Sequence, residues 1–134
     1  MDPKAVLESI NILAVDDMDA ILGVIKGCLK NLGAQKVDLA SNGEAAWKIL
    51  QQKNIHLIVC DWDMPKMTGY ELLLKVRNSP EHAHIPFLLL TATNDKQKVL
   101  HAIKAGVNEY VAKPFQPKEL EYRIVKLLGR IKLS

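Results

Sequence analysis

Six polar side chains that could handle a charged substrate follow short apolar segments of this sequence. They are four carboxylates, one hydroxyl and one amine: Asp16, Asp17, Asp61, Asp63, Thr91 and Lys113. Carboxylates that share one site repel one another by about 4 kcal/mol per pair at ~4 Å and an effective dielectric constant near 20. A cluster of this kind therefore needs a cation or a raised pKa.

The cation that such a cluster would hold can be inferred from its ligands, which are oxygen atoms. Cys60 is the nearest sulfur, and it belongs to an apolar segment that we expect to be buried. Hard oxygen ligands favour Mg²⁺, or Mn²⁺ in its place, over zinc. A carboxylate beside Mg²⁺, with Lys113 and Thr91 opposite, suits a phosphoryl group: metal and amine neutralise its oxygens, and the hydroxyl donates a hydrogen bond. The residues therefore predict phosphoryl chemistry, with one aspartate as the nucleophile.

The apolar segments that precede these side chains predict a parallel β-sheet. Residues 12–15, 57–60 and 87–90 are continuously apolar, as in strands that are buried on both faces, and residues 110–112 form a shorter fourth segment. Residues 37–40 alternate instead, as in an edge strand with one exposed face. In open α/β sheets the ligand site lies beyond the carboxyl ends of the strands, so one edge of the sheet would gather all the polar side chains.

Between the predicted strands, apolar residues recur every three or four positions, which predicts helices. The first such stretch, residues 21–32, would end at Gly33, and the fourth would end at Gly106. Ser41 and Glu44 have the spacing of a capping box. The fifth apolar face continues to Ile131, and Asp2-Pro3 would begin a short extra helix at the N-terminus. Five strand–helix units result, which is the pattern of an α/β fold with right-handed crossovers.

Composition favours a single small domain. The 134 residues are 49% hydrophobic and 25% charged, and we expect one domain over residues 1–134 with no output domain. The longest apolar runs have four residues, which excludes a membrane helix, and two cysteines are too few for a disulfide scaffold. We therefore expect a cytoplasmic location.

Charge is distributed unevenly along the chain. The net charge of +3 does not indicate a nucleic-acid-binding protein. From His101 onward there are seven Lys/Arg and three Asp/Glu, a local excess of +4. Basic residues of the last helix most simply form its solvated face, and they favour a protein-docking surface over a nucleic-acid site.

Four separated segments resemble a response-regulator receiver domain, and most closely its CheY-like, single-domain chemotaxis type. They are Asp16-Asp17, residues 61–69 (DWDMPKMTG), Thr91-Ala92 and residues 110–115 (YVAKPF). The resemblance implies a doubly wound, flavodoxin-like sheet of five parallel strands in the order 2-1-3-4-5. Five helices would flank the sheet, with the short extra helix at the N-terminus. It also implies a phospho-accepting switch of a two-component system that transfers and hydrolyses only its own phosphoryl group and is not otherwise an enzyme.

By the same resemblance, Asp61 would take a phosphoryl group from a phosphohistidine of a histidine kinase. Asp17 and Asp61 would bind Mg²⁺ directly, Asp16 would bind it through a water molecule, and Asp63 would bind it through its backbone carbonyl. The downstream partner would be a protein such as a flagellar motor switch.

The resemblance also implies how the phosphoryl group is sensed. Thr91 and Lys113 would bind its oxygens, and Thr91 and Tyr110 would then move as the switch. The Lys113–Pro114 peptide bond would be cis.

Three departures from the family pattern bear on lifetime and target. Position 63 is Asp where CheY-like chains usually carry Asn, and position 93 is Thr where they often carry Glu. Both positions are associated in the family with how long the phosphoryl group persists. The first long helix carries Ile21-Leu22-Gly23 where CheY has paired arginines, which bears on binding to a motor switch.

Three other interpretations remain open from sequence. An Asp-x-Asp pair after a buried strand also occurs in haloacid-dehalogenase phosphatases, where it follows the first strand rather than the third. A receiver could alternatively act as a phosphate sink. His82-x-His84 could bind a metal, although a histidine pair in a loop is usually solvated.

Overall fold

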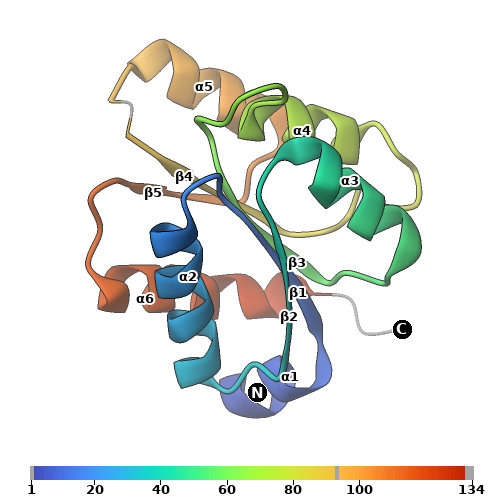
Figure 1. The fold of residues 1–134 in the computed structure, drawn as a ribbon, viewed down its shortest axis with the longest axis vertical. Helices are drawn as coiled ribbons and strands as arrows, with labels where there is room; N and C mark the ends of the chain where they lie inside the picture. Colours follow the sequence, from blue (N-terminus) through green and yellow to red (C-terminus); the bar gives the residue numbers. More distant parts are fainter. Residues whose placement is uncertain (1, 93, 132–134) are drawn as a thin grey trace.

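A computed structural model describes residues 2–92 and 94–131 as a five-stranded sheet flanked by helices (Figure 1). The strands are β1 (Asn11–Val15), β2 (Lys36–Ala40), β3 (Leu57–Asp61), β4 (Phe87–Thr91) and β5 (Glu109–Ala112). The helices are α1 (Pro3–Ser9), α2 (Asp19–Leu32), α3 (Gly43–Gln52), α4 (Gly69–Arg77), α5 (Lys96–Ala105), α6 (Pro117–Leu127) and the 3₁₀ helix η1 (Leu128–Arg130). All strands are parallel in the order β2-β1-β3-β4-β5, which confirms the predicted fold class.

The central strands are buried on both faces, as their continuous apolar sequences predict. Every residue of β3 and β4 is buried, and side chains of the sheet alternate between two hydrophobic cores. One core lies between the sheet and α1, α2 and α6; the other lies between the sheet and α3, α4 and α5 (Figure 1). Full burial of a leucine or isoleucine side chain contributes about 1.5–3 kcal/mol, so these layers stabilise the strands that carry the polar residues.

The edge strand β2 lies where residues 37–40 predict it, but its exposure differs from a simple alternation. Val37 packs against the core beside α2. Leu39 lies on the same face of the strand, because it is two residues further along, but it is 41% exposed. Ala40, on the opposite face, is buried in the other core. The margin of an edge strand is covered only where a helix reaches it, and this decides which residues are buried.

Most predicted helix ends are confirmed. Asp2 caps α1 by accepting a hydrogen bond from the Lys4 N–H, and Gly33 and Gly106 end α2 and α5 in the left-handed conformation, with φ of 118° and 97°. The predicted capping box at Ser41 is wrong, because Asn42 caps α3 and accepts a hydrogen bond from the Ala45 N–H. Asparagine is as good an N-cap as serine, so the helix begins one residue later.

The end of the last helix also differs from the prediction. The apolar face that the sequence extends to Ile131 is α-helical only to Leu127, and the next turn is the tighter η1. A 3₁₀ turn at a helix C-terminus is common, because it pairs carbonyls that would otherwise lack a partner.

Arg77, at the C-terminus of α4, joins that helix to the loop before β4 and to the loop after α5. Its guanidinium donates hydrogen bonds to the carbonyls of Ala83, Ile85 and Gly106 and to the side-chain oxygen of Asn108, at 2.6–3.1 Å. Burial lowers the pKa of Arg77. The same Asn108 oxygen accepts a hydrogen bond from the N–H of Phe87 at 2.8 Å, so this group of hydrogen bonds also includes the first residue of β4.

Within the described residues, no helix combines the length and the hydropathy that crossing a membrane requires. Both cysteines, Cys28 and Cys60, are buried free thiols.

Candidate functional site

The residues predicted to carry chemistry lie together at the carboxyl edge of the sheet. Asp61 and Thr91 are the last residues of β3 and β4, Asp16 directly follows β1, and Lys113 directly follows β5. Asp16, Asp61 and Thr91 are buried, with exposed fractions of 0%, 3% and 1%. Parallel pairing of β1, β3, β4 and β5 therefore brings side chains almost a hundred residues apart into one site.

Lys113 bridges two buried carboxylates. Its Nζ lies 3.0 Å from Asp16 Oδ2 and 3.0 Å from Asp61 Oδ1. Burial alone would lower the pKa of Lys113, but hydrogen bonds and attraction to Asp61 and Asp16 outweigh it, so the pKa is raised. The Lys113–Pro114 peptide bond that follows is cis, as the resemblance implies.

For Asp61, the effect of burial on the pKa outweighs the effect of its charged partner. Burial raises the pKa of its carboxyl, and repulsion from Asp16 adds to this, while Lys113 and a hydrogen bond from the Asp63 backbone N–H act against it. The shift is upward, because burial together with Asp16 outweighs the effect of Lys113.

Asp17 completes a group of acidic side chains whose chemistry fits a hard cation. One oxygen atom from each of Asp16, Asp17 and Asp61 lies within 4.8 Å of the others, and Asp17 is exposed. Asp16 Oδ1 accepts a hydrogen bond from the Met18 N–H at 2.9 Å, and Oδ2 faces Lys113. Both Asp16 oxygens therefore have a protein partner already. Three carboxylates with one nearby amine form an all-oxygen, electron-rich donor set that fits Mg²⁺ or Mn²⁺.

Asp63 lies beside this group rather than in it. Its side chain is exposed, and its carboxylate does not belong to the three-carboxylate group. It meets the site through its backbone N–H, which acts to lower the pKa of the Asp61 carboxyl.

Sequence reasoning missed two residues that hold the loop after Asp61. Gly69 begins α4 and donates its N–H to the Trp62 carbonyl at 2.9 Å. A Cβ atom at this position would overlap the carbonyl oxygen of Asp61. Tyr70 stacks on Trp62 with ring centroids 5.4 Å apart and an angle of 9°. The glycine at the end of residues 61–69 was the available signal for the close approach, whereas nothing in the sequence indicates the ring stack.

Of the two predicted switch residues, Thr91 is buried in the site and Tyr110 is not. Thr91 accepts a hydrogen bond from the Lys113 N–H through its backbone carbonyl, at 2.8 Å. Tyr110 is 43% exposed and lines a groove of about 430 Å³ between α5 and β5, with Val99 and Leu100 among its other lining residues. The prediction made for position 93 lies outside the described residues.

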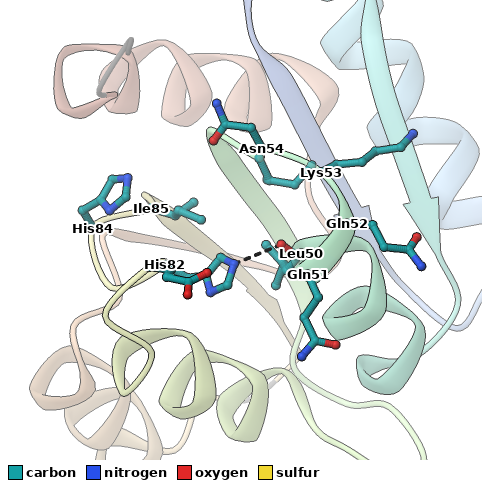
Figure 2. Close-up of a pocket in the computed structure, with 10 residues that line it drawn as sticks. Leu50, Gln51, Gln52, Lys53, Asn54, His82, His84 and Ile85 are labelled. Carbon is teal, nitrogen blue, oxygen red and sulfur yellow. Dashed lines mark hydrogen bonds between the residues drawn. The ribbon is translucent and has the colours of Figure 1, made fainter.

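His82 and His84 lie at the other end of the molecule, in a cavity of about 230 Å³ between the end of α3 and the loop before β4 (Figure 2). The Nε2–H of His82 donates to the Leu50 carbonyl at 3.0 Å, so its Nδ1 accepts the hydroxyl proton of Ser79 at 2.8 Å. Both ring nitrogens of His82 therefore have protein partners. This favours a structural role for His82, and among the described residues only the three-aspartate group at the carboxyl edge has the arrangement of a metal site.

Comparisons with known proteins agree with this geometry. The family model described as the response regulator receiver domain matches residues 12–125. A CheY homolog named as a chemotaxis protein in Campylobacter jejuni is 37% identical over 119 residues, which are 88% of this chain and 92% of that relative. The chemotaxis protein CheY of Pseudomonas aeruginosa is 38% identical over 120 residues, 90% of this chain and 97% of that protein.

A solved structure shows the same likeness in three dimensions. The receiver domain of a sensor histidine kinase from Pseudomonas aeruginosa PAO1 superposes with a TM-score of 0.79 and 28% identity. The match covers 90% of this chain and 98% of that one. That structure is described with a magnesium ion coordinated in its active-site cleft.

Proposed function

The chain belongs to the response regulator receiver domain family, and on this premise we propose that it is a CheY-like signalling switch that is phosphorylated on Asp61. CheY-like receiver domains are signalling proteins rather than conventional enzymes. The acidic pair of a haloacid-dehalogenase phosphatase follows the first strand, whereas Asp61 and Asp63 follow the third, which also favours signalling.

One observation carries the proposal: a single amine, Lys113, lies 3.0 Å from both Asp16 and Asp61, at the end of a three-carboxylate group. A structural ion pair would be satisfied by one carboxylate and one amine. Here three carboxylates share one site with one amine, which leaves an excess of negative charge that a cation or a raised pKa must balance. An uncompensated charge cluster at the carboxyl edge of an α/β sheet is typical of a functional site.

In the proposed transfer, an Asp61 carboxylate oxygen attacks the phosphorus of a phosphohistidine on a histidine kinase. An oxygen–phosphorus bond forms, the phosphorus–nitrogen bond breaks, and the electron pair returns to the imidazole of the kinase. Attack requires the ionised carboxylate, which Lys113 favours against the effect of burial. Asp16 orients this amine through the 3.0 Å contact with Oδ2.

Asp17 and Asp61 would hold Mg²⁺ directly and Asp16 through water, because both Asp16 oxygens already have protein partners. Position 63 would contribute its backbone carbonyl. Bound Mg²⁺ would supply positive charge that neutralises the oxygens of the phosphoryl group. Lys113 and the Thr91 hydroxyl would bind the other phosphoryl oxygens.

The signal would leave through the surface formed by α5, β5 and α6. Leu100, Ile103 and Tyr110 are 51%, 53% and 43% exposed there, which is unusual for large apolar side chains and typical of a docking surface. We propose that Thr91 and Tyr110 change position on phosphorylation and that a downstream chemotaxis protein, such as a flagellar motor switch, reads this surface.

Acetyl phosphate tests the central claim without a partner kinase. The protein is incubated with acetyl phosphate and Mg²⁺, and its intact mass is measured beside Asp61→Asn and Asp63→Asn. We expect one added phosphoryl group on the wild type and on Asp63→Asn, and none on Asp61→Asn. A wild type that stays unmodified, or an Asp61→Asn variant that is modified as readily, would contradict the proposal.

A further inference from the structure

The loop that follows Asp61, residues 62–68, is closed at its base. The N–H of Gly69 donates to the Trp62 carbonyl at 2.9 Å, and the N–H of Met67 donates to the Pro65 carbonyl at 2.8 Å. Thr68 and Glu71 form a capping box that fixes the first turn of α4. Hydrogen bonds therefore fix the backbone at both ends of this loop.

Trp62 is the residue through which this loop acts on the site, because it stands between Asp61 and Asp63. Its backbone N–H donates to the Leu90 carbonyl at 2.8 Å, which continues the pairing of β3 with β4 by one residue. The next N–H, that of Asp63, lies near the carboxyl of Asp61 and acts to lower its pKa. The orientation of the backbone over residues 61–63 therefore decides how this N–H is placed relative to the Asp61 carboxyl.

The ring of Trp62 is held from one side by Tyr70. The two rings are nearly parallel, at 9°, with centroids 5.4 Å apart. Trp62 is 8% exposed, whereas Tyr70 is only partly buried and belongs to the first turn of α4, which the capping box fixes. Tyr70 thus stacks on the one side chain that lies between the two aspartates.

We propose that Tyr70 is a positioning residue of the phosphoryl-accepting site, acting through its stack on Trp62 to hold the backbone over residues 61–63. The inference rests on the proposed function of Asp61 and names a further residue on which it depends. Loss of the stack frees the Trp62 ring, shifts the backbone that carries the Asp63 N–H and the Asp61 carboxyl, and slows phosphorylation. Small misplacements of a reacting group reduce rates strongly, so we expect a loss of about threefold to tenfold.

The test compares variants that keep or remove the ring. Tyr70→Phe keeps the aromatic face, and Tyr70→Leu removes it while preserving an apolar, helix-forming side chain. Tyr122→Leu is the matched control, since Tyr122 is 61% exposed on α6 and distant in sequence from the loop. All are made in a Trp47→Phe background, so that fluorescence reports Trp62 alone of the two tryptophans.

Three measurements are made on each variant. Acrylamide quenching of Trp62 and amide hydrogen exchange at Asp63 are measured without Mg²⁺, and the rate of phosphoryl gain from acetyl phosphate is measured by intact mass with Mg²⁺. We expect Tyr70→Leu to increase quenching, to speed exchange at Asp63 and to slow phosphorylation by about threefold to tenfold. Tyr70→Phe and Tyr122→Leu should match the background protein in all three.

The outcomes separate this inference from the proposed function. Phosphorylation of Tyr70→Leu at the background rate, or equal loss in Tyr70→Phe, would overturn the role of the stack while leaving Asp61 as the acceptor. A background protein that gains no phosphoryl group at all would contradict the proposed function and this inference with it. Should Tyr70→Leu not fold, Tyr70→Met makes the same comparison with a more adaptable side chain.

Discussion

At the scale of single residues, the buried carboxylates of the site lower the stability of the folded protein. Asp16 and Asp61 are buried carboxylates that share the single amine of Lys113, and Asp17 adds a third negative charge beside them. Each buried charge costs desolvation, and the Lys113 amine can balance only one of them. Without a bound cation, this edge of the sheet is therefore a source of instability.

Replacing Asp61 by Asn should accordingly stabilise the metal-free protein. Burial and the neighbouring Asp16 raise the pKa of Asp61, so the folded state binds the proton more tightly than the unfolded state does. Ionisation then favours the unfolded state, and stability is lost as pH rises through the raised pKa. We expect Asp61→Asn to unfold at higher urea concentration at pH 7 in EDTA, by roughly 0.5–2 kcal/mol, and the gain to shrink as pH falls through the raised pKa and to be absent below the ordinary Asp value of 3.8.

The exposed neighbour Asp63 supplies the control for this measurement. Asp63→Asn removes an equal charge two residues away without relieving a buried one, so its urea midpoint should stay near that of the wild type. A gain in Asp63→Asn as large as that in Asp61→Asn would attribute the effect to net charge rather than to burial.

The sequence allowed the reacting side chains to be predicted, because their types and their places at strand ends are both local features. Asp16, Asp61, Thr91 and Lys113 lie where the ends of four apolar segments indicate. The Trp62–Tyr70 stack could not be predicted, since it depends on the angle at which α4 leaves the loop. The same holds for the five hydrogen bonds of Arg77, whose partners are mostly carbonyls that every residue carries.

At the scale of elements, α4 is placed so closely against the end of β3 that only glycine fits at its first position. A Cβ atom at position 69 would overlap the backbone carbonyl of Asp61, whereas one at Gly23, on the exposed side of α2, would meet nothing within 4 Å. The two glycines thus offer opposite predictions for the same substitution.

Gly69→Ala should force α4 away from Asp61, lower stability by about 1–3 kcal/mol and slow phosphorylation, because overpacking shifts the backbone. Gly23→Ala should stabilise the protein by about 0.5–1 kcal/mol, because it removes the entropic cost of glycine in a helix. Thermal melts and acetyl phosphate rates of both variants measure this. Equal tolerance of alanine at the two positions would show that α4 can move freely.

Arg77 joins α4 to the loop before β4 and to the loop after α5, and its loss should separate them. Arg77→Ala leaves the carbonyls of Ala83, Ile85 and Gly106 and the oxygen of Asn108 without their shared donor. We expect a loss of about 2–4 kcal/mol in urea unfolding, with Arg77→Lys recovering only part of it, because an amine lacks the planar fork of a guanidinium. Arg130→Ala, which changes an exposed side chain of η1, is the control and should change little.

Element boundaries show where local sequence patterns stop being sufficient. Continuous apolar segments and glycine ends located the strands and the ends of α2 and α5, since burial and a left-handed turn each demand particular residue types. Two other boundaries are not decided by residue type. Ser41 and Asn42 are both good caps, and the structure uses Asn42 for α3. The apolar face after Leu127 fits an α-helix as well as the 3₁₀ turn that is present. Packing against the rest of the chain makes those decisions.

At the scale of the whole molecule, the excess negative charge should make stability depend on Mg²⁺. A ligand that binds only the folded state stabilises it by RT ln(1 + [L]/Kd), which is about 1.4 kcal/mol at tenfold excess over Kd. We expect Mg²⁺ to raise the melting temperature by a few degrees and Asp17→Ala to abolish the rise.

Glu81→Ala, which removes an exposed acid in the loop before β4, should keep the full response to Mg²⁺. A melting temperature that responds equally in Asp17→Ala would place the ion elsewhere on the surface.

The packing of α1 has a practical consequence for handling the protein. This helix contacts α2 and η1 at the end of the sheet where the strands begin, and Leu7 and Ile10 enter the core there. Asp61 lies at the far end of the strand β3, where the strands finish. An affinity tag, fluorescent fusion or chip linker joined ahead of α1 would therefore project away from the phosphoryl site, which makes that end the attachment point for a biosensor.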